Sequence, residues 1–223
     1  MPEHIPVLTI DGPGGVGKGT VSQLLAKHFG WRFLDSGAIY RVLALAVLRD
    51  NCAFNNEPRI VHLAQTLAAE FKDNKAWLDG QDVSTELRSE ACSDVASKIA
   101  AIPEVRAALL ERQRQFAQSP GLVADGRDMG TVVFPEAFLK IYLDATVEER
   151  AQRRFLQLKK SGYNAKLADL ITDIIQRDLR DKTRAVAPLK PAEDAILVDT
   201  SQMKIEEVFN LIVGYAEQRL SKR

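Results

Sequence analysis

The chain has 223 residues, 46% of them hydrophobic, which predicts one compact domain or one domain with a modest insertion. Its 30 basic and 30 acidic residues balance, which disfavours nucleic-acid binding through a net positive field. The sequence has only two cysteines, no leader-like start and no apolar run of about 18 residues. We therefore expect a soluble, cytoplasmic monomer that binds neither membranes nor nucleic acid, with Cys52 and Cys92 as inert buried thiols.

A glycine-rich segment at residues 11–20, DGPGGVGKGT, follows a strand predicted over 7–10 and precedes a helix predicted from Val21. Glycines permit positive φ and let successive N–H groups face an anion at the helix N-terminus. Lys18 adds a charge for the β- and γ-phosphates, and Thr20 offers a hydroxyl to a bound metal. A turn that only links strand and helix is a poor alternative at this spacing. We therefore predict a nucleoside triphosphate site made of Gly12, Pro13, Gly14, Gly15, Val16, Gly17, Lys18, Gly19 and Thr20.

Gly19 stands where the general G-x-x-x-x-G-K-[ST] pattern has its hydroxyl residue, and Thr20 follows one place later. This G-K-G-T variant resembles the nucleoside monophosphate kinases more than the regulatory GTPases. A guanine-reading N-K-x-D sequence, which a GTPase switch would carry, is absent from the sequence.

The next strand, predicted over 31–34, delivers residues 35–41 to the sheet edge that carries the phosphate loop, because loops after parallel strands share one rim. Asp35 or Ser36 can cap the following helix. In its first turns, Arg41 either meets an anion or is an ordinary solvated arginine, and spacing alone leaves both open.

The alternation of strands and helices is interrupted after residue 51. A helix begins near Pro58, and short strand-like pieces flank an Asp79-Gly80 pair, which is a hairpin signal. These features predict a small antiparallel insertion over 58–88, which is either a surface ornament or an element that closes over substrate.

Residues 89–118 predict two helices, of which the second starts at Pro103. Arg112 and Arg114 are expected to face solvent there. Arg106 lies near the helix start and could turn inward, which periodicity does not decide.

A buried strand over 122–124 ends in Asp125-Gly126-Arg127. A carboxylate that closes a strand beside a phosphate loop suits the metal side of a nucleotide, so Asp125 is the candidate carboxylate for Mg²⁺, directly or through water. Arg127 suits a bidentate phosphate contact, with an internal Arg–Asp pair in the turn as the alternative.

A strand over 139–144 leads to a helix that opens with a capping box at Thr146 and Glu149. This helix carries three arginines that form either a solvated basic face or part of a mobile lid over about 150–165, with its tip at 161–164. They are Arg150, Arg153 and Arg154.

The following helix combines apolar residues at helical spacing with a highly charged end. We predict that its inward residues are Leu167, Leu170, Ile171, Ile174 and Ile175. We also expect one face of its charged end to be presented to the cleft, with Arg177, Arg180 or Asp181, and Arg184. A strand over 195–199 and an amphipathic helix complete the chain.

These elements together predict an α/β fold of the P-loop NTPase type, in three layers, with a five-stranded parallel sheet, a helical lid and the small antiparallel insertion. The core domain would comprise residues 1–57 and 89–223.

Four segments, at residues 10–20, 35–41, 125–135 and 177–189, occur in the order found in the bacterial-type cytidylate kinases, and the chain resembles that family over nearly its whole length. The resemblance implies transfer of the γ-phosphoryl group from ATP to CMP or dCMP, with Mg²⁺ as cofactor. One departure is Gly14, where the family usually has serine. Alternatives are a uridylate, adenylate or other small-acceptor kinase, and a P-loop switch that recruits a partner.

The resemblance also implies roles for individual residues. Lys18 and the loop amides would hold the ATP phosphates, and the lid interpretation adds Arg153 and Arg154 to the ATP contacts. The residues expected to take part in catalysis are Lys18, Asp125, Arg127 and Arg184. The expected CMP contacts are Arg41, Arg127 and Arg184 at the acceptor phosphate, Ser97, Arg106 and Asp128 at the cytosine edge, Arg177 and Asp181 at the ribose, and Ser36 and Tyr40 as further contacts.

Overall fold

The computed structural model describes residues 5–72, 75–160 and 162–221. Contacts between Cα atoms divide the chain into two compact units. The core unit comprises residues 1–34 and 116–223, and the inserted unit comprises residues 35–115. The inserted unit contains the predicted insertion together with the helices that flank it.

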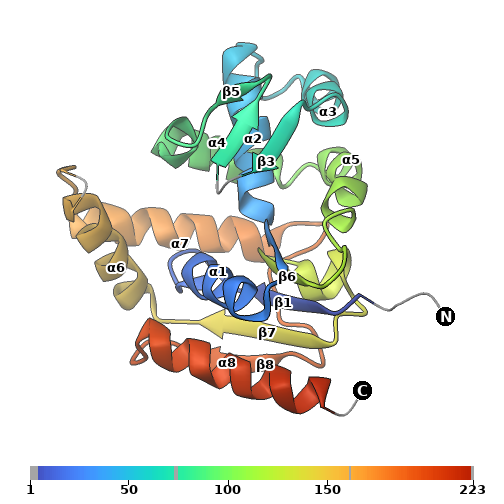
Figure 1. The fold of residues 1–223 in the computed structure, drawn as a ribbon. Helices are drawn as coiled ribbons and strands as arrows, with labels where there is room; N and C mark the ends of the chain where they lie inside the picture. The colour runs from blue at the N-terminus through green and yellow to red at the C-terminus, as the bar shows by residue number, and fades with distance from the viewer. Residues whose placement is uncertain (1–4, 73–74, 161, 222–223) are drawn as a thin grey trace. The chain divides into compact units, whose positions relative to one another are not determined.

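The core unit is built on a five-stranded sheet with the strand order β2-β6-β1-β7-β8 (Figure 1). Strand β1 lies at its centre and pairs in parallel with β6 and β7, while β7 pairs in parallel with β8. The strands are β1 (Val7–Asp11), β2 (Arg32–Asp35), β6 (Leu122–Gly126), β7 (Leu139–Asp144) and β8 (Ile196–Asp199). The predicted α/β fold with a five-stranded parallel sheet is therefore confirmed.

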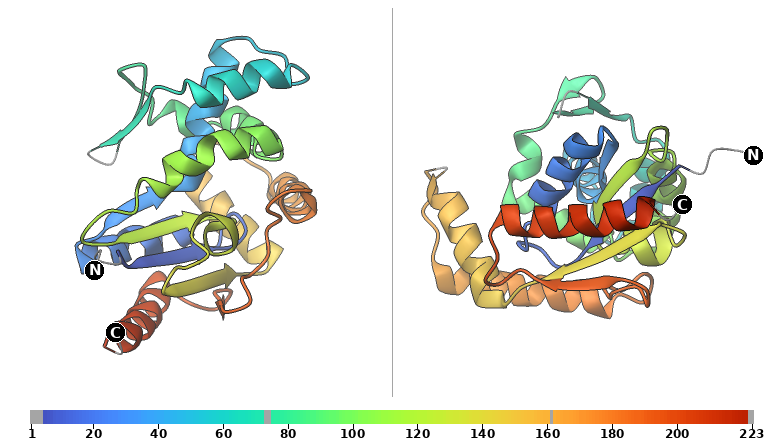
Figure 2. Two further views of the ribbon diagram at one scale, coloured as in Figure 1. Left: turned by 90° about the vertical axis from the view of Figure 1, so that its right-hand side faces the viewer. Right: turned by 60° about the horizontal axis from the view of Figure 1, so that its bottom comes forward.

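All residues of β1 and β6 are buried, as is typical of parallel strands that are covered on both faces. Leu8 and Ile10 of β1 lie on the face that packs against helices α1 (Lys18–Phe29) and α8 (Ile205–Leu220). Figure 2 shows α8 lying along this sheet. Helix α1 ends at Gly30, whose φ of 66° gives a left-handed C-cap, a conformation that glycine adopts without a steric penalty.

The remaining core helices are α6 (Val147–Lys160), α7 (Leu167–Thr183) and the single π-turn η2 (Met129–Val133). Thr146 Oγ1 accepts a hydrogen bond from the N–H of Glu149, at 3.3 Å, which is one half of the predicted capping box. The chain then turns at Gly162, with a φ of 81°. Ser161, which belongs to the predicted lid tip, lies outside the described residues.

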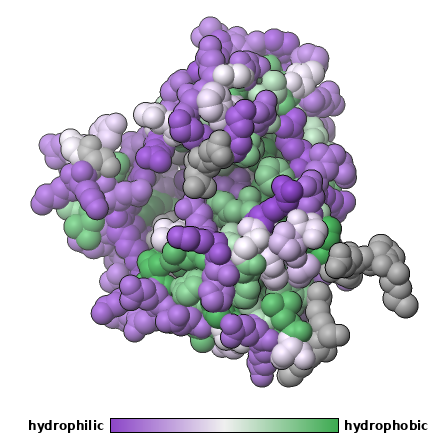
Figure 3. Space-filling model, in the orientation of Figure 1, coloured by the Kyte–Doolittle hydropathy of each residue, from purple (hydrophilic) through white to green (hydrophobic). Residues whose placement is uncertain are grey.

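The prediction for the inward face of α7 is wrong at two positions. Leu170 is buried, but Leu167 is 39% exposed and Ile175 is 50% exposed. The charged residue Asp178 occupies buried surface on this helix instead, because Arg150 of α6 pairs with it. Figure 3 shows hydrophobic atoms at the left of the view, where α6 lies in Figure 1, among hydrophilic neighbours.

The inserted unit contains a separate antiparallel sheet with the order β3-β4-β5. Asp79 and Gly80 have φ values of 51° and 76°, as a two-residue hairpin turn between β4 and β5 requires. The predicted hairpin and its separation from the main sheet are confirmed. The elements of this unit are α2 (Ser36–Arg49), α3 (Glu57–Gln65), β3 (Ala69–Lys72), β4 (Lys75–Leu78), β5 (Gln81–Asp82), η1 (Glu86–Arg88), α4 (Glu90–Ile99) and α5 (Pro103–Arg114).

Two further expectations for this unit need correction. Arg112 is not simply solvated, because its guanidinium donates to the carbonyl oxygens of Leu67, at 2.6 Å, and Ala69, at 3.2 Å. Cys92 is buried as predicted, but Cys52 is partly exposed. Within the described ranges, none of the helices has both the length and the apolar character needed to cross a membrane.

Candidate active site

The phosphate loop connects β1 to α1 and has the backbone that its glycines predict. Gly12, Gly15 and Gly17 have φ values of 145°, 86° and 92°, which residues with a side chain rarely adopt. A Cβ atom on Gly12 would also overlap the carbonyl oxygen of Leu143. Because the first N–H groups of a helix have no intrahelical partner, this loop presents donors to an anion.

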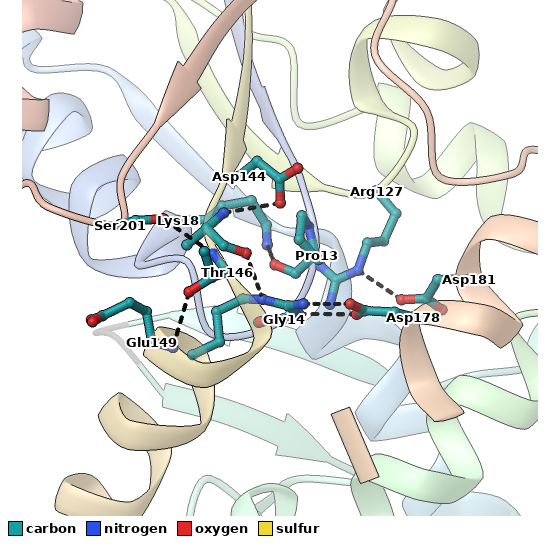
Figure 4. A network of polar contacts seen from close by, with 12 residues as sticks. Pro13, Gly14, Lys18, Arg127, Asp144, Thr146, Glu149, Asp178, Asp181 and Ser201 are labelled. Carbon is teal, nitrogen blue, oxygen red and sulfur yellow. Dashed lines mark hydrogen bonds and ion pairs between the residues drawn. The ribbon is translucent and has the colours of Figure 1, made fainter. Parts of the chain in front are cut away.

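Lys18 is folded back onto its own loop. Its Nζ donates to the carbonyl oxygen of Pro13, at 2.7 Å, and the side chain is only 5% exposed (Figure 4). Burial, together with the nearby charge of Arg127, lowers the pKa of Lys18 to about 7, while Asp125 and Asp11 act against this shift. A phosphate group arriving at the loop would supply the counter-charge that favours the ammonium form.

Asp125 and Thr20 are the two residues predicted on the metal side. Asp125 is buried at the end of β6, whereas the Thr20 side chain is exposed in the first turn of α1. A Cβ atom on Gly19 would lie 3.4 Å from Oδ2 of Asp125, so the glycine keeps the space beside this carboxylate open. No group of three or more His, Cys, Asp or Glu side chains in the described part of the chain could hold a metal. A carboxylate and a hydroxyl nevertheless fit Mg²⁺, which prefers oxygen ligands and keeps several waters and substrate phosphates in its shell.

Arg127 forms an ion pair, but its partner is on another element and not in its own turn. Its Nε donates to Oδ2 of Asp181 on α7, at 3.0 Å (Figure 4). Its Nη1 donates to the carbonyl of Gly126, at 3.2 Å. Burial opposes ionisation of Asp181, but the positive charges of Arg127, Arg177 and Arg184 hold its pKa below the usual value. The fold therefore brings together four charged side chains, Arg127, Arg177, Asp181 and Arg184, from two segments that lie far apart in the sequence.

The three arginines of α6 differ in their surroundings. Arg153 is held by Thr200, whose carbonyl oxygen accepts at 2.6 Å, and Arg154 donates to Gln157, at 3.3 Å. Arg150 is not solvated, since it is 2% exposed and its Nη1 and Nη2 bond both carboxylate oxygens of Asp178.

Arg150 also contacts the phosphate loop. Its Nη1 donates to the carbonyl of Gly14, at 3.2 Å, and its Nε donates to the carbonyl of Ala145, at 3.1 Å. The sequence analysis did not assign Arg150 or Asp178 to the site. In the sequence, Arg150 is distinguished only by lying on the same helix as the expected ATP contacts Arg153 and Arg154, and Asp178 only by following the expected CMP contact Arg177.

In the inserted unit, Asp35 caps α2 by accepting from the N–H of Ala38, at 2.8 Å, as predicted. Its other carboxylate oxygen accepts from Nη2 of Arg41, at 2.9 Å. Ser36 donates its hydroxyl hydrogen to Oε1 of Gln113, at 2.7 Å. Gln113 is buried and was missed, because one glutamine on a helix carries no sequence signal of its own.

Arg106 turns inward, which resolves the choice that periodicity left open. Its guanidinium carbon lies 5.8 Å from the ring centroid of Tyr40, and its Nη1 donates to the carbonyl of Ala100, at 3.3 Å. Ser97 is 5% exposed, and its Oγ has no hydrogen-bond partner among the described residues. Because a buried hydroxyl without a partner costs free energy, it is available to a ligand.

Comparison with known proteins gives a consistent result. A model of the family described as cytidylate kinase matches residues 8–218. A protein named cytidylate kinase from Aeromonas hydrophila subsp. hydrophila is 56% identical over 99% of this chain and 97% of its own. One of the same name from Shewanella sp. (strain MR-4) is 56% identical over 99% of both chains.

Among solved structures, a gluconokinase from Sinorhizobium meliloti 1021 matches with a TM-score of 0.48 and 13% identity, over 97% of this chain and 94% of its own. At that level the likeness adds nothing to the fold described above. The family match and the two relatives span nearly the whole length of the chain. This chain belongs to the cytidylate kinase family.

Proposed function

We propose that this protein transfers the γ-phosphoryl group of ATP to CMP or dCMP, giving ADP and CDP or dCDP. Membership of the cytidylate kinase family over nearly the full length carries this proposal. The core unit also has the charges that the reaction needs, because Lys18 and Arg127 lie on the two segments where the donor and acceptor phosphates are expected.

In-line transfer of a phosphoryl group requires two anionic nucleotides to be held together while charge develops on the transferring oxygens. No protein nucleophile is needed. Lys18 and the loop amides would hold the β- and γ-phosphates of ATP, and Arg127 and Arg184 would stabilise the transferring group. Lys18 bonds to the carbonyl oxygen of Pro13 and Arg127 bonds to the carboxylate of Asp181, so each side chain is held by a defined partner within the core unit.

Mg²⁺ would neutralise part of the negative charge of the ATP phosphates. Thr20 would offer its hydroxyl to this ion, and Asp125 would act directly or through water. The oxygen-only character of these two side chains supports the assignment.

Individual residues are proposed to recognise the acceptor. Ser97, Arg106 and Asp128 would meet the cytosine edge. The buried, unpartnered Oγ of Ser97 supports this role, because a base could satisfy it. The further acceptor contacts that we propose are Arg177 and Asp181 at the ribose, Arg41, Arg127 and Arg184 at the phosphate, and Ser36 and Tyr40 beside them.

The finer points of organisation stay predictions. They are a lid over about 150–165 that includes the ATP contacts Arg153 and Arg154, a substrate-side insertion at 58–88 within a core of 1–57 and 89–223, a monomeric state and a cytoplasmic location. Both cysteines are free thiols, which agrees with a reducing compartment.

A direct assay tests the proposed reaction. ADP formation from MgATP is measured with CMP, dCMP, UMP and AMP as separate acceptors at equal concentration. We expect CMP and dCMP to give the highest kcat/KM. Equal or higher values with UMP or AMP would overturn the acceptor assignment, and slow ADP formation that no acceptor accelerates would indicate a nucleotide switch.

A further inference from the structure

Asp11 is the last residue of β1 and makes two hydrogen bonds that neither the phosphate loop nor the acceptor residues explain. Its Oδ1 accepts from the N–H of Met129 and its Oδ2 from the N–H of Gly130, both at 2.8 Å. These residues are 118 and 119 positions away in the sequence. They directly follow Arg127 and Asp128, two of the core residues proposed to meet the acceptor.

The sheet register explains how Asp11 reaches this segment. Asp11 pairs with Gly126 of β6, whereas its neighbour Ile10 pairs with Asp125. Because successive residues of a strand point to opposite faces, Asp11 and the metal-side candidate Asp125 lie on opposite faces of the sheet. Asp11 therefore points away from α1 and toward the η2 turn.

The first N–H groups of the η2 turn have the Asp11 carboxylate as their hydrogen-bond acceptor. Asp128 is the N-cap residue of η2, and its side chain makes no capping hydrogen bond. The N–H groups at the start of a helical turn lack partners inside the turn. Asp11 supplies two acceptors to them from a distant strand, and so acts as a capping group that local sequence does not provide.

Keeping a carboxylate at this position is costly. Asp11 is buried, and burial is the main reason that its pKa is raised to about 7; the charge of Asp128 also raises the pKa, while the two N–H bonds and Lys18 act against this shift. The Asp11 carboxylate also interacts electrostatically with the guanidinium of Arg127 and the ring hydroxyl of Tyr142. A serine or asparagine side chain could also accept a hydrogen bond at this position, and burying it would cost less free energy than burying a carboxylate. Stability alone therefore does not explain why a carboxylate, with two accepting oxygens, stands at position 11.

We propose that Asp11 is a positioning residue that fixes Arg127 and Asp128 with respect to the phosphate loop. Asp11 is joined through the backbone to the loop that begins at Gly12, and through its two carboxylate oxygens to the backbone that carries the two acceptor residues. One side chain therefore sets the spacing between the donor phosphates and the acceptor contacts of the core unit. This inference rests on the proposed acceptor roles of Arg127 and Asp128.

The test compares Asp11→Asn with the wild-type enzyme. Asparagine keeps the shape but offers only one acceptor oxygen, and its NH₂ group opposes the second N–H. We expect kcat/KM for CMP to fall by at least about tenfold, through both a lower kcat and a higher KM for CMP, while the KM for ATP stays within about threefold. Asp50→Asn is the matched control, because it removes an exposed carboxylate that pairs with the exposed Arg59, and it should leave all constants unchanged.

The outcomes are distinguishable. A variant that is merely less stable would have a smaller active fraction, which lowers the apparent kcat without raising the KM for CMP, and this result would overturn the proposal. An equal rise in both KM values would also overturn it. Loss of CMP phosphorylation in the wild-type enzyme itself would instead refute the proposed function.

Amide hydrogen exchange of the wild-type enzyme gives a second measurement that does not depend on the folding of a variant. The N–H groups of Met129 and Gly130 should exchange as slowly as that of Val133, which bonds the carbonyl of Asp128. Exchange at the rate of exposed amides would overturn the proposal. In Asp11→Asn, protection at Met129 and Gly130 should fall by about tenfold or more, while that of Val133 changes less.

Discussion

The guanidinium of Arg150 and the carboxylate of Asp178 form a bidentate ion pair, with Nη1–Oδ1 at 3.0 Å and Nη2–Oδ2 at 2.5 Å. The pair joins the first turn of α6 to α7, and Arg150 extends the connection to the carbonyl of Gly14 in the phosphate loop. Three segments that are far apart in the sequence therefore meet at one buried arginine.

We expect Asp178→Ala to lower the free energy of unfolding by about 3 kcal/mol, because it leaves the Arg150 charge buried without its partner. Urea denaturation measures this change. Asp94→Ala, which removes the exposed i,i+4 partner of Lys98, should give no comparable loss. Similar effects for both variants would show that burial does not distinguish the two pairs.

Lys18→Met should separate activity from stability. We expect kcat to fall by about a hundredfold or more, because the charge that stabilises the transferring phosphoryl group is lost. Burial lowers the pKa of Lys18 in the folded state to about 7, so the unfolded chain binds the proton more tightly. The lowered pKa therefore means that Lys18 reduces the free energy of unfolding. This reduction is largest below pH 7, where Lys18 is charged in both states, and it declines as the pH rises toward the pKa of the unfolded chain. The variant should therefore be at least as stable as the wild type at pH 7, and a marked drop in Tm would contradict this account.

ATP binding should take up a proton above neutral pH. In the empty protein the lowered pKa leaves Lys18 largely neutral at pH 8, and the phosphates of bound ATP favour its charged form. Calorimetric titrations in two buffers of different ionisation enthalpy measure the uptake, which should approach one proton at pH 8 and decrease toward pH 6. Lys18→Met should show much less uptake, and an unchanged value in that variant would assign the proton to another group.

Ser97→Ala should raise the KM for CMP by about tenfold while leaving the protein as stable or slightly more stable. The Ser97 hydroxyl is buried without a partner, so its removal relieves a desolvation cost in the empty protein but takes a hydrogen bond from the bound base. Ser22 is a matched control on α1, because its Oγ is also buried without a partner. Ser22→Ala should leave the KM for CMP unchanged, and equal effects of the two variants on that KM would argue against a role of Ser97 in base recognition.

The sequence by itself determined the elements whose causes are local. Positive φ at Gly12, Gly15 and Gly17 follows from glycine spacing, and the β4–β5 hairpin follows from Asp79-Gly80, because both depend on what a short stretch of backbone can adopt. The parallel sheet could be predicted for a related reason, since its strands are short, continuously apolar and separated by amphipathic helices.

Only the tertiary structure decided which polar side chains are buried and what they bond. The sequence leaves open whether Arg150 is solvated, whereas the fold buries it beside Asp178, 28 residues away. Leu167 and Ile175 fit the apolar period of α7 and are nevertheless exposed. Asp11 caps a turn more than a hundred residues away. A helical period or a capping pattern depends only on residues within a few positions of one another in the sequence. The burial of a charged side chain depends instead on a partner that is distant in the sequence and that the fold brings close.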